Sequence, residues 1–152
     1  MCDDIGVDLL VDGKNDTYWQ SDGTQPHLIT LQFQQTVEVS RIAVQTDYRM
    51  DESYTPQKLS VRIGTRWSDM KVLRTDEVQE PQGWIVIPLG KGSVSGYPGR
   101  ILQIGILANH QNGRDTHVRQ IKVFGPREDV LSSIRSDVRW MTSEATMYAT
   151  CR

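Results

Sequence analysis

The sequence predicts an all-β fold, an antiparallel β-sandwich of the jelly-roll type, and three observations carry that prediction. Short segments alternate apolar and polar residues with a period of two, as Ile29, Leu31 and Phe33 do. Gly, Pro, Asn or Asp residues bound these segments. No long segment between positions 28 and 124 has the 3.6-residue period of a crossover helix, so parallel βαβ units have no place in the chain. The sheets are therefore expected to be antiparallel.

The strands are expected at short segments along most of the chain. They cover 29–33, 39–46, 59–63, 69–74, 84–89, 100–107 and 117–124. Apolar residues on both faces at 84–89 and 101–107 predict central strands covered on each side, which would bury Trp84 in the core. The alternating strands are expected to face water on one side.

Size and charge restrict the class of protein. The 152 residues suffice for one domain with a single core. The net charge of -2, with 17 Lys and Arg against 19 Asp and Glu, gives no cationic patch for nucleic acid. No run approaches the roughly 20 apolar residues of a membrane helix, and the first residues lack a secretory signal. With Cys2 and Cys151 far apart, reducing surroundings are expected, in the nucleus and cytoplasm.

Antiparallel order also predicts which connections share an end of the sandwich. Segments 12–27, 47–57, 75–83 and 108–116 fall at one end, and 34–38, 65–68 and 90–99 at the other. Two connections of the first set are rich in side chains able to bind a ligand, namely Asp51–Thr55 and Asn109–His117. The sequence therefore predicts a binding site at that end.

Catalysis does not fit these residues well. Ser53, His117 and Asp115 could be read as a triad, but the strand-to-helix elbow that presents a nucleophilic serine is absent. We therefore expect no catalytic residue and no enzyme activity.

Metal binding is also weakly supported. His110 and His117 lack a third strong ligand, so hydrogen bonding is the preferred reading. The Asp12–Asp16 segment hints at a calcium loop, but Lys14 occupies the third position, where the EF-hand pattern needs an oxygen ligand. We expect turn-capping aspartates and no cofactor, with a structural calcium ion left open.

Two long stretches go beyond generic sandwich features. They are DTYWQSDGTQPHL (16–28), continued by Asp47-Tyr48 and Asp51–Pro56, and LANHQNGRDTH (107–117), continued by Arg119–Lys122. Over about residues 6 to 126 the chain closely resembles the Doc-type (subunit ten) family of the anaphase-promoting complex, or cyclosome. The resemblance implies a galactose-binding-like jelly roll without ligase activity of its own, which acts in cell-cycle protein degradation.

The resemblance also implies a function for the polar end. Family members act as substrate co-receptors and processivity subunits of an E3 ubiquitin ligase, and capture the destruction-box degron of mitotic substrates together with a WD40 coactivator. Matching positions here are Ser53, Tyr54, Asn112, Arg114, Asp115 and His117. The alternative class is a carbohydrate- or lipid-binding module of the discoidin or galactose-binding-like type, in which aromatic residues such as Trp19 would be exposed. We expect Trp19 to pack beneath the loops instead.

The chain divides into a Doc-type sandwich domain at 1–126 and an irregular tail at 127–152. A weak apolar stripe over 130–141 leaves a helix or an extended tail open. By resemblance, the last two residues dock into a tetratricopeptide-repeat scaffold subunit of the complex. Arg152 matches the family pattern, and Cys151 departs from it. The family's strand before Gly6 is also expected to be missing, which would leave a sheet edge bare.

Overall fold

A computed structural model describes residues 7–21, 23–89, 96–126 and 145–150 of the chain. Almost all of its regular structure is β-strand, with one short α-helix and a few 3-10 helices (η). The elements are η1 (Val7–Leu10), β1 (Trp19–Gln20), β2 (His27–Val39), β3 (Arg41–Asp47), α1 (Tyr48–Asp51), η2 (Glu52–Tyr54), β4 (Pro56–Gly64), η3 (Trp67–Asp69), β5 (Lys71–Glu77), β6 (Gln82–Pro88), β7 (Tyr97–Asn109), η4 (His110–Asn112), β8 (His117–Val118), β9 (Gln120–Phe124) and β10 (Ala145–Thr150).

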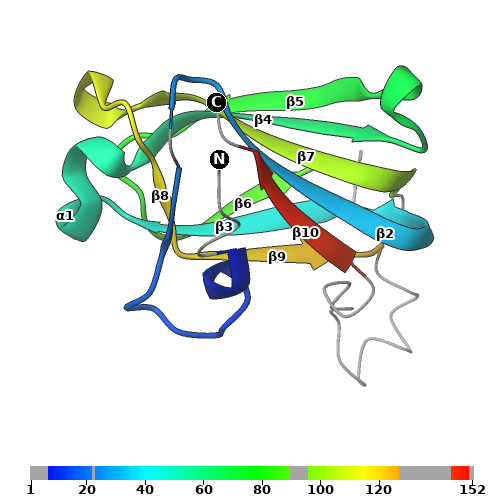
Figure 1. Ribbon diagram of the computed structural model, residues 1–152, viewed down its shortest axis with the longest axis horizontal. Helices are drawn as coiled ribbons and strands as arrows, with labels where there is room; N and C mark the ends of the chain where they lie inside the picture. Colours follow the sequence, from blue (N-terminus) through cyan, green and yellow to red (C-terminus); the bar gives the residue numbers. More distant parts are fainter. Residues whose placement is uncertain (1–6, 22, 90–95, 127–144, 151–152) are drawn as a thin grey trace.

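Two antiparallel sheets form the sandwich that the sequence predicts. The larger sheet has the order β10-β2-β7-β4-β5, and the smaller has the order β6-β3-β9 (Figure 1). A separate short pair, β1 with β8, lies beside them. None of the described helices is long and apolar enough to cross a membrane.

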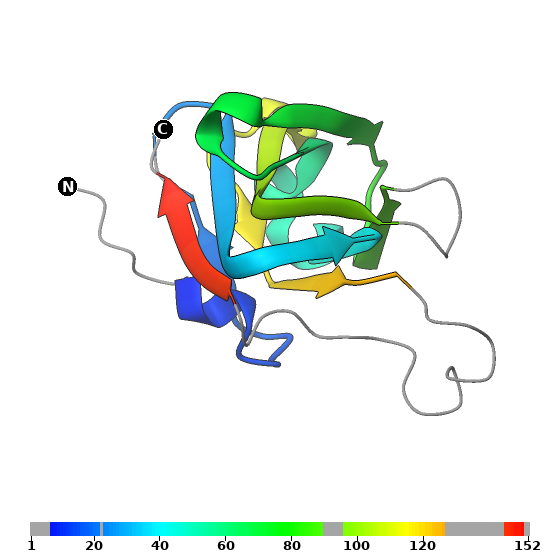
Figure 2. The ribbon, with the colours of Figure 1, turned by 90° about the vertical axis from the view of Figure 1, so that its right-hand side faces the viewer.

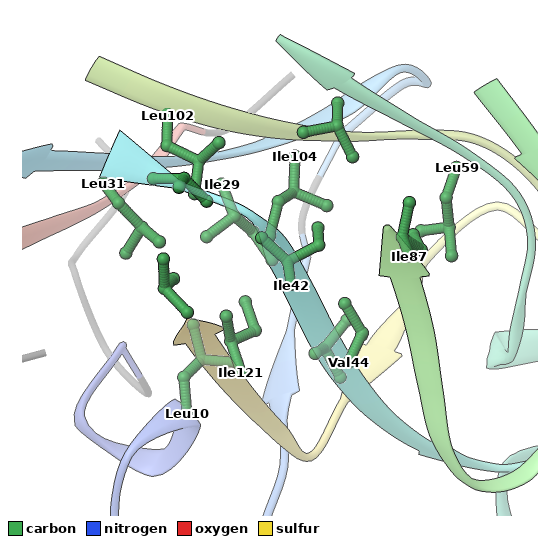
Figure 3. Close-up of a cluster of buried hydrophobic side chains, with 14 of the residues drawn as sticks. Leu10, Ile29, Leu31, Ile42, Val44, Leu59, Ile87, Leu102, Ile104 and Ile121 are labelled. Atoms are coloured by element: carbon green, nitrogen blue, oxygen red, sulfur yellow. The ribbon is translucent and has the colours of Figure 1, made fainter. Parts of the chain in front are cut away.

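The core lies between the facing sheets and is built by strand alternation. Ile29, Leu31 and Phe33 of β2 are each at most 1% exposed, as their period-two spacing predicts. They meet Ile42 and Ile121 from the smaller sheet, and Leu10 of η1 adds to the same cluster (Figure 3). This core, rather than any site residue, holds the two sheets together.

The two strands expected to be central have different positions. β7 lies between β2 and β4, with Ile104 and Ile106 fully buried, so that prediction is confirmed. The prediction for 84–89 is wrong, because β6 is an edge strand of the smaller sheet. Trp84 and Val86 point outward, 40% and 55% exposed, and the Lys122 ammonium lies 4.6 Å from the Trp84 ring centroid. An outer face covered by a lysine has the same apolar sequence pattern as a buried one.

The ends of the sandwich are divided as antiparallel order predicts, except that the expected connection 34–38 lies within β2, which continues to Val39. Figure 1 shows α1 and the turn that follows β7 at one end, with the β4–β5 turn at the other. Hydrogen bonds tie the connections at the first end together: the Tyr48 amide donates to the Pro81 carbonyl over 2.9 Å, and the His110 amide to the Thr55 carbonyl over 3.0 Å. The polar loops therefore share one end of the fold.

The described part of the tail is a strand, whereas the sequence predicts an irregular segment. Residues 145–150 form β10, which pairs antiparallel with β2 from Ala145 opposite Phe33 to Thr150 opposite Leu28 (Figure 2). This strand covers the edge of β2, so that edge is not bare. β9 ends at the end of the sandwich away from the polar loops, and β10 runs back toward the start of β2. The expected stripe over 130–141 lies outside the described residues.

Candidate functional site

The predicted site residues lie on two connections that touch each other. Tyr54 belongs to the segment between β3 and β4, and its carbonyl accepts a hydrogen bond of 3.1 Å from the Thr116 hydroxyl of the segment after β7. Gly113 packs so closely on the first segment that a Cβ placed there would collide with the Ser53 carbonyl. We call Ser53, Tyr54, Asn112, Arg114, Asp115 and His117 the polar rim. The structure brings all six together at one end of the sandwich.

A buried histidine fixes the two connections to a third. His110 is 5% exposed, and its Nδ1 lies 3.1 Å from the Thr55 carbonyl. Its Nε2 accepts a hydrogen bond of 3.0 Å from the Glu80 amide in the connection between β5 and β6. A neutral imidazole with its hydrogen on Nδ1 satisfies both bonds. His110 therefore stabilises the loops and has no free nitrogen for a metal.

Asn109 stabilises the connection after β7 by hydrogen bonds to its backbone. It is 2% exposed, and its Nδ2 donates to the Asp115 carbonyl over 2.6 Å and to the Gly113 carbonyl over 3.3 Å. Asn112 and Arg114 are exposed, whereas Asp115 is half-buried. The buried amide thus holds the backbone while neighbouring polar side chains face solvent.

The segment before β2 supports the same turn from the other side. The Gln25 amide donates to the Gly113 carbonyl over 2.9 Å, and His27 Nε2 lies 2.5 Å from the Arg114 carbonyl. His27 is fully buried, which indicates a structural role. The Arg114 Nε in turn donates to the Gly23 carbonyl over 3.3 Å. Three connections therefore enclose the base of the polar rim.

A buried ion pair lies beneath His117. Arg119 holds Asp51 with two hydrogen bonds, from Nε to Oδ2 over 3.1 Å and from Nη2 to Oδ1 over 2.8 Å. Burial opposes ionisation of Asp51, but the hydrogen bonds from His117 and Arg119 and the charge of Arg119 outweigh it and lower the pKa of Asp51. The hydrogen bond to Asp51 likewise raises the pKa of Arg119. Both groups are therefore charged at neutral pH.

His117 is clamped on all sides. Its Nδ1 lies 3.2 Å from Asp51 Oδ1, and its Nε2 lies 3.2 Å from Gln20 Oε1. The Tyr18 ring stacks on one face at a centroid distance of 4.0 Å and the Tyr54 ring stacks at 4.3 Å. The imidazole is only 8% exposed, whereas Tyr18 and Tyr54 are 38% and 41% exposed. Ligands at this point meet the tyrosines before the histidine.

The loop backbone at this end is unusual. Within the described part of the chain, the residues other than glycine with a positive φ are Glu52, Glu80, Gln111 and Asn112, with φ between 41° and 55°. Each lies in one of the connections at the polar end. A left-handed conformation costs on the order of 1 kcal/mol or more for such a residue and persists only where surrounding contacts impose it. The hydrogen bonds described above supply those contacts.

The Asp12–Asp16 segment makes its own hydrogen bonds. The Asp12 carboxylate accepts from the Lys14 amide and from the Thr17 hydroxyl, and these bonds, that of Thr17 first, lower its pKa. Arg119 and Gln120 donate to the Asn15 and Lys14 carbonyls. The turn-capping interpretation is confirmed for Asp12. No group of three or more metal-ligating side chains occurs among the residues that the structure describes.

Sequence reasoning missed three residues of this end. Tyr18 stacks on His117 because the β1–β8 pairing sets Gln20 opposite His117, and Asp51 joins His117 to Arg119 by hydrogen bonds. Trp19, one residue further, is 3% exposed and packs beneath the loops as expected. Cys151 and Arg152, the predicted docking residues, lie outside the described residues.

Comparison with known proteins identifies the family. The family model described as "Anaphase-promoting complex, subunit 10" matches residues 2–150. The chain belongs to this family. Anaphase-promoting complex subunit 10 of Bos taurus is 47% identical over 148 residues, covering 97% of this chain and 79% of the relative. The Drosophila melanogaster protein is 43% identical with 97% and 76% covered, and the DOC1 subunit of Saccharomyces cerevisiae is 32% identical with 81% and 50% covered.

Solved structures agree on the fold of this family member. The CBM32-5 domain from Clostridium perfringens, solved in complex with GalNAc-β-1,3-galactose, superposes with a TM-score of 0.66 at 12% identity, covering 82% of this chain and 89% of that domain. An F5/8 type C domain from Bacteroides fragilis gives a TM-score of 0.65 at 13% identity, covering 82% and 83%. At such identities the likeness concerns the fold alone. The predicted galactose-binding-like jelly roll and the resemblance to the Doc-type family are both confirmed, and the chain is a subunit of the anaphase-promoting complex.

Proposed function

We propose that the chain is a non-catalytic substrate-recognition subunit, which acts as a destruction-box co-receptor and processivity factor of the anaphase-promoting complex in the nucleus and cytoplasm. The observation that carries this proposal is the convergence of the Ser53–Tyr54 segment and the Asn112–His117 segment on one rim. Side chains from two distant parts of the chain can then contact one extended peptide. Membership of the anaphase-promoting complex family supports this proposal, because a subunit of a complex can act beside a second substrate receptor.

The chemistry of the polar rim suits a peptide backbone. Asn112 offers an amide that both donates and accepts, Arg114 offers a guanidinium and Asp115 a carboxylate. These groups satisfy backbone N–H and C=O groups with little demand on side-chain sequence. His117, whose nitrogens and ring faces are engaged, serves by positioning Tyr54. The polar rim is therefore suited to a short extended segment.

Contact with so few side chains is expected to be weak alone. Stable protein interfaces bury at least roughly 1,200 Å² with about 20–30 residues a side, whereas the polar rim has six residues. A WD40 coactivator fixed nearby would raise the effective concentration of the peptide and multiply its affinity by about 10²–10⁴. Longer residence would allow several ubiquitins to be added in one encounter. We therefore propose that the WD40 coactivator and this chain share the substrate.

The tail supplies the second partner in this proposal. Cys151 and Arg152 would dock into a tetratricopeptide-repeat scaffold subunit, while other scaffold subunits contact the sandwich. Because Cys is a smaller apolar group than Ile or Leu, position 151 would bury less area in its pocket. Arg152 would then contribute most of the affinity, through charge-assisted hydrogen bonds.

A carbohydrate-binding function is less well supported by the loop end. Trp19, the aromatic side chain that such a module would expose, is 3% exposed, and the exposed aromatic residues at this end, Tyr18 and Tyr54, stack on His117. Beside them the polar rim carries an amide, a guanidinium and a carboxylate. These groups favour peptide capture.

Co-purification tests the proposal directly. Tagged wild type, Asn112→Ala/Asp115→Ala and an Arg152-deleted form are purified from cells of the source organism, and tetratricopeptide-repeat subunits are detected by antibody. Wild type is expected to bring down these subunits, the Arg152 deletion to weaken their recovery, and the loop variant to retain them but lower ubiquitination of a destruction-box substrate. Recovery of glycoproteins or lipids without complex subunits would defeat the assignment.

A further inference from the structure

Tyr18 is the exposed aromatic side chain that the polar rim does not include. It lies one residue before β1, whose register sets Trp19 opposite Val118 and Gln20 opposite His117. Strand alternation turns Trp19 into the core, where it is 3% exposed, and leaves Tyr18 outside at 38% exposure. The chain therefore presents a second tyrosine beside the predicted one, Tyr54.

The stack around His117 fixes both tyrosines in place. The Tyr18 and His117 rings are inclined by 18°, and the Tyr54 and His117 rings by 12°, so three nearly parallel rings form one block. Asp51 and Gln20 hold the central imidazole in its plane. Rigid aromatic side chains bind at a low cost in conformational entropy, because little motion is lost.

The outer parts of this block are left for a ligand. Among the described residues, none hydrogen-bonds to the Tyr18 or Tyr54 hydroxyl, and both residues are more than a third exposed. The imidazole between them has neither a free nitrogen nor a free face. Contact at this point is therefore made by apolar ring surface together with two phenolic hydroxyls.

The charges around the block select the kind of side chain that it accepts. The Arg119 guanidinium lies 5.7 Å from the Tyr18 ring centroid and is bound by both oxygens of Asp51, so the pair offers little net charge to attract either a cation or an anion. A charged side chain would therefore lose solvation at the block without gaining an ion pair, whereas an uncharged, apolar side chain has no such cost.

We propose that Tyr18 is a further specificity-determining residue, which together with Tyr54 receives an aliphatic side chain of the bound peptide. The two hydroxyls hydrogen-bond the peptide backbone on either side of that residue. Tyr18 touches the ligand, whereas His117, Asp51 and Arg119 are positioning residues. This inference rests on the proposed capture of peptides at the polar rim and names the side-chain class that the polar rim selects.

Peptide binding to the assembled complex tests the role of Tyr18. The complex is reconstituted with its coactivator and each variant, and a fluorescein-labelled destruction-box peptide is titrated by polarisation. Tyr18→Leu is expected to weaken binding about five- to tenfold, as for a moderate interface hot spot. Tyr18→Phe, which keeps the stacked ring and loses one hydroxyl, is expected to weaken it about twofold. Tyr97→Leu is the matched control, since Tyr97 is also 38% exposed but lies at the opposite end of the sandwich, and it is expected to bind as wild type does.

A double-mutant cycle identifies the aliphatic group. Each aliphatic residue of the peptide is replaced by Ala in turn, and one replacement is expected to weaken binding to wild type but not to Tyr18→Leu. The inference is overturned if Tyr18→Leu binds every peptide as wild type does, or if no aliphatic position is coupled to Tyr18. Asn112→Ala/Asp115→Ala separates the two failures: if this variant weakens binding while Tyr18→Leu does not, only the role of Tyr18 fails. If neither variant changes binding, the proposed peptide site fails as well.

Discussion

The contact between the two connections of the polar rim is most directly perturbed at Gly113. Its φ of -60° and ψ of 146° suit any residue, so Gly113→Ala adds no backbone strain. The new Cβ would instead collide with the Ser53 carbonyl and lie 3.2 Å from the Ser53 Cβ. Because the collision involves backbone, the two segments must move apart.

The cost of this separation follows from the bonds that join the segments. Forcing one extra carbon into a packed site costs about 1–3 kcal/mol. The Thr116 hydroxyl and the His110 amide bridge the same gap, and each bond contributes about 1 kcal/mol. We therefore expect Gly113→Ala to lower the free energy of unfolding by about 2–3 kcal/mol, and the melting temperature by about 4–12 °C.

Thermal unfolding and substrate ubiquitination are measured together. Gly13→Ala is the matched control, because Gly13 has a φ of +76° and open space around it. Its loss of about 1 kcal/mol comes from the left-handed backbone, and the two segments of the polar rim stay together. We expect Gly113→Ala to lose ubiquitination of destruction-box substrates while Gly13→Ala retains it. A Gly113→Ala protein with the melting temperature of wild type would refute the close packing of the two segments.

Three further outcomes follow from the structure. Asp51→Asn leaves Arg119 buried without its carboxylate, so we expect a loss of about 3 kcal/mol at pH 7 in denaturant unfolding. The folded-state pKa of Asp51 lies below 3.8, so the difference in stability between wild type and Asp51→Asn is full above pH 3.8 and narrows as the pH falls through the folded-state pKa. A difference in stability that stays constant with pH would contradict this account. Trp19→Ala is expected to cost about 3–5 kcal/mol and Trp84→Ala clearly less, since Trp84 is 40% exposed; equal losses would count against the outward position of Trp84. Cys151 and Arg152 come directly after Thr150, so their docking is expected to draw β10 from β2. Amides of 145–150 should exchange slowly in the isolated chain and faster on binding the scaffold, and unchanged exchange would show that both contacts coexist.

The sequence predicts the parts of the fold that depend on local periodicity. Alternation fixes the inward face of β2 through Ile29 and Leu31, and antiparallel order places the polar connections at one end. It fails at Trp84, because an apolar residue covered by a lysine and one covered by a sheet have the same pattern. It also gives no sign that β10 pairs with β2, since strand partners are set by packing between distant segments.

The sequence predicts the loops that form the site from their polar composition, but it does not predict the hydrogen bonds and ion pairs between their residues. The polar composition of the Asn109–His117 segment predicts a binding end, but not that Asn109 and His110 are used internally. The break between β8 and β9 falls at Arg119, whose ion pair with Asp51 likewise leaves no mark in the sequence. Such interactions join residues far apart in the chain, so only the structure reveals them.

The shared peptide surface is tested most directly by measuring the affinity of a labelled destruction-box peptide for the coactivator-bound complex with and without this subunit. Addition of the wild-type chain is expected to tighten binding by at least tenfold. Addition of Asn112→Ala/Asp115→Ala, incorporated to the same level, is expected to restore little of that gain. Equal affinities for the complex with wild type, with the variant and without the subunit would contradict the account.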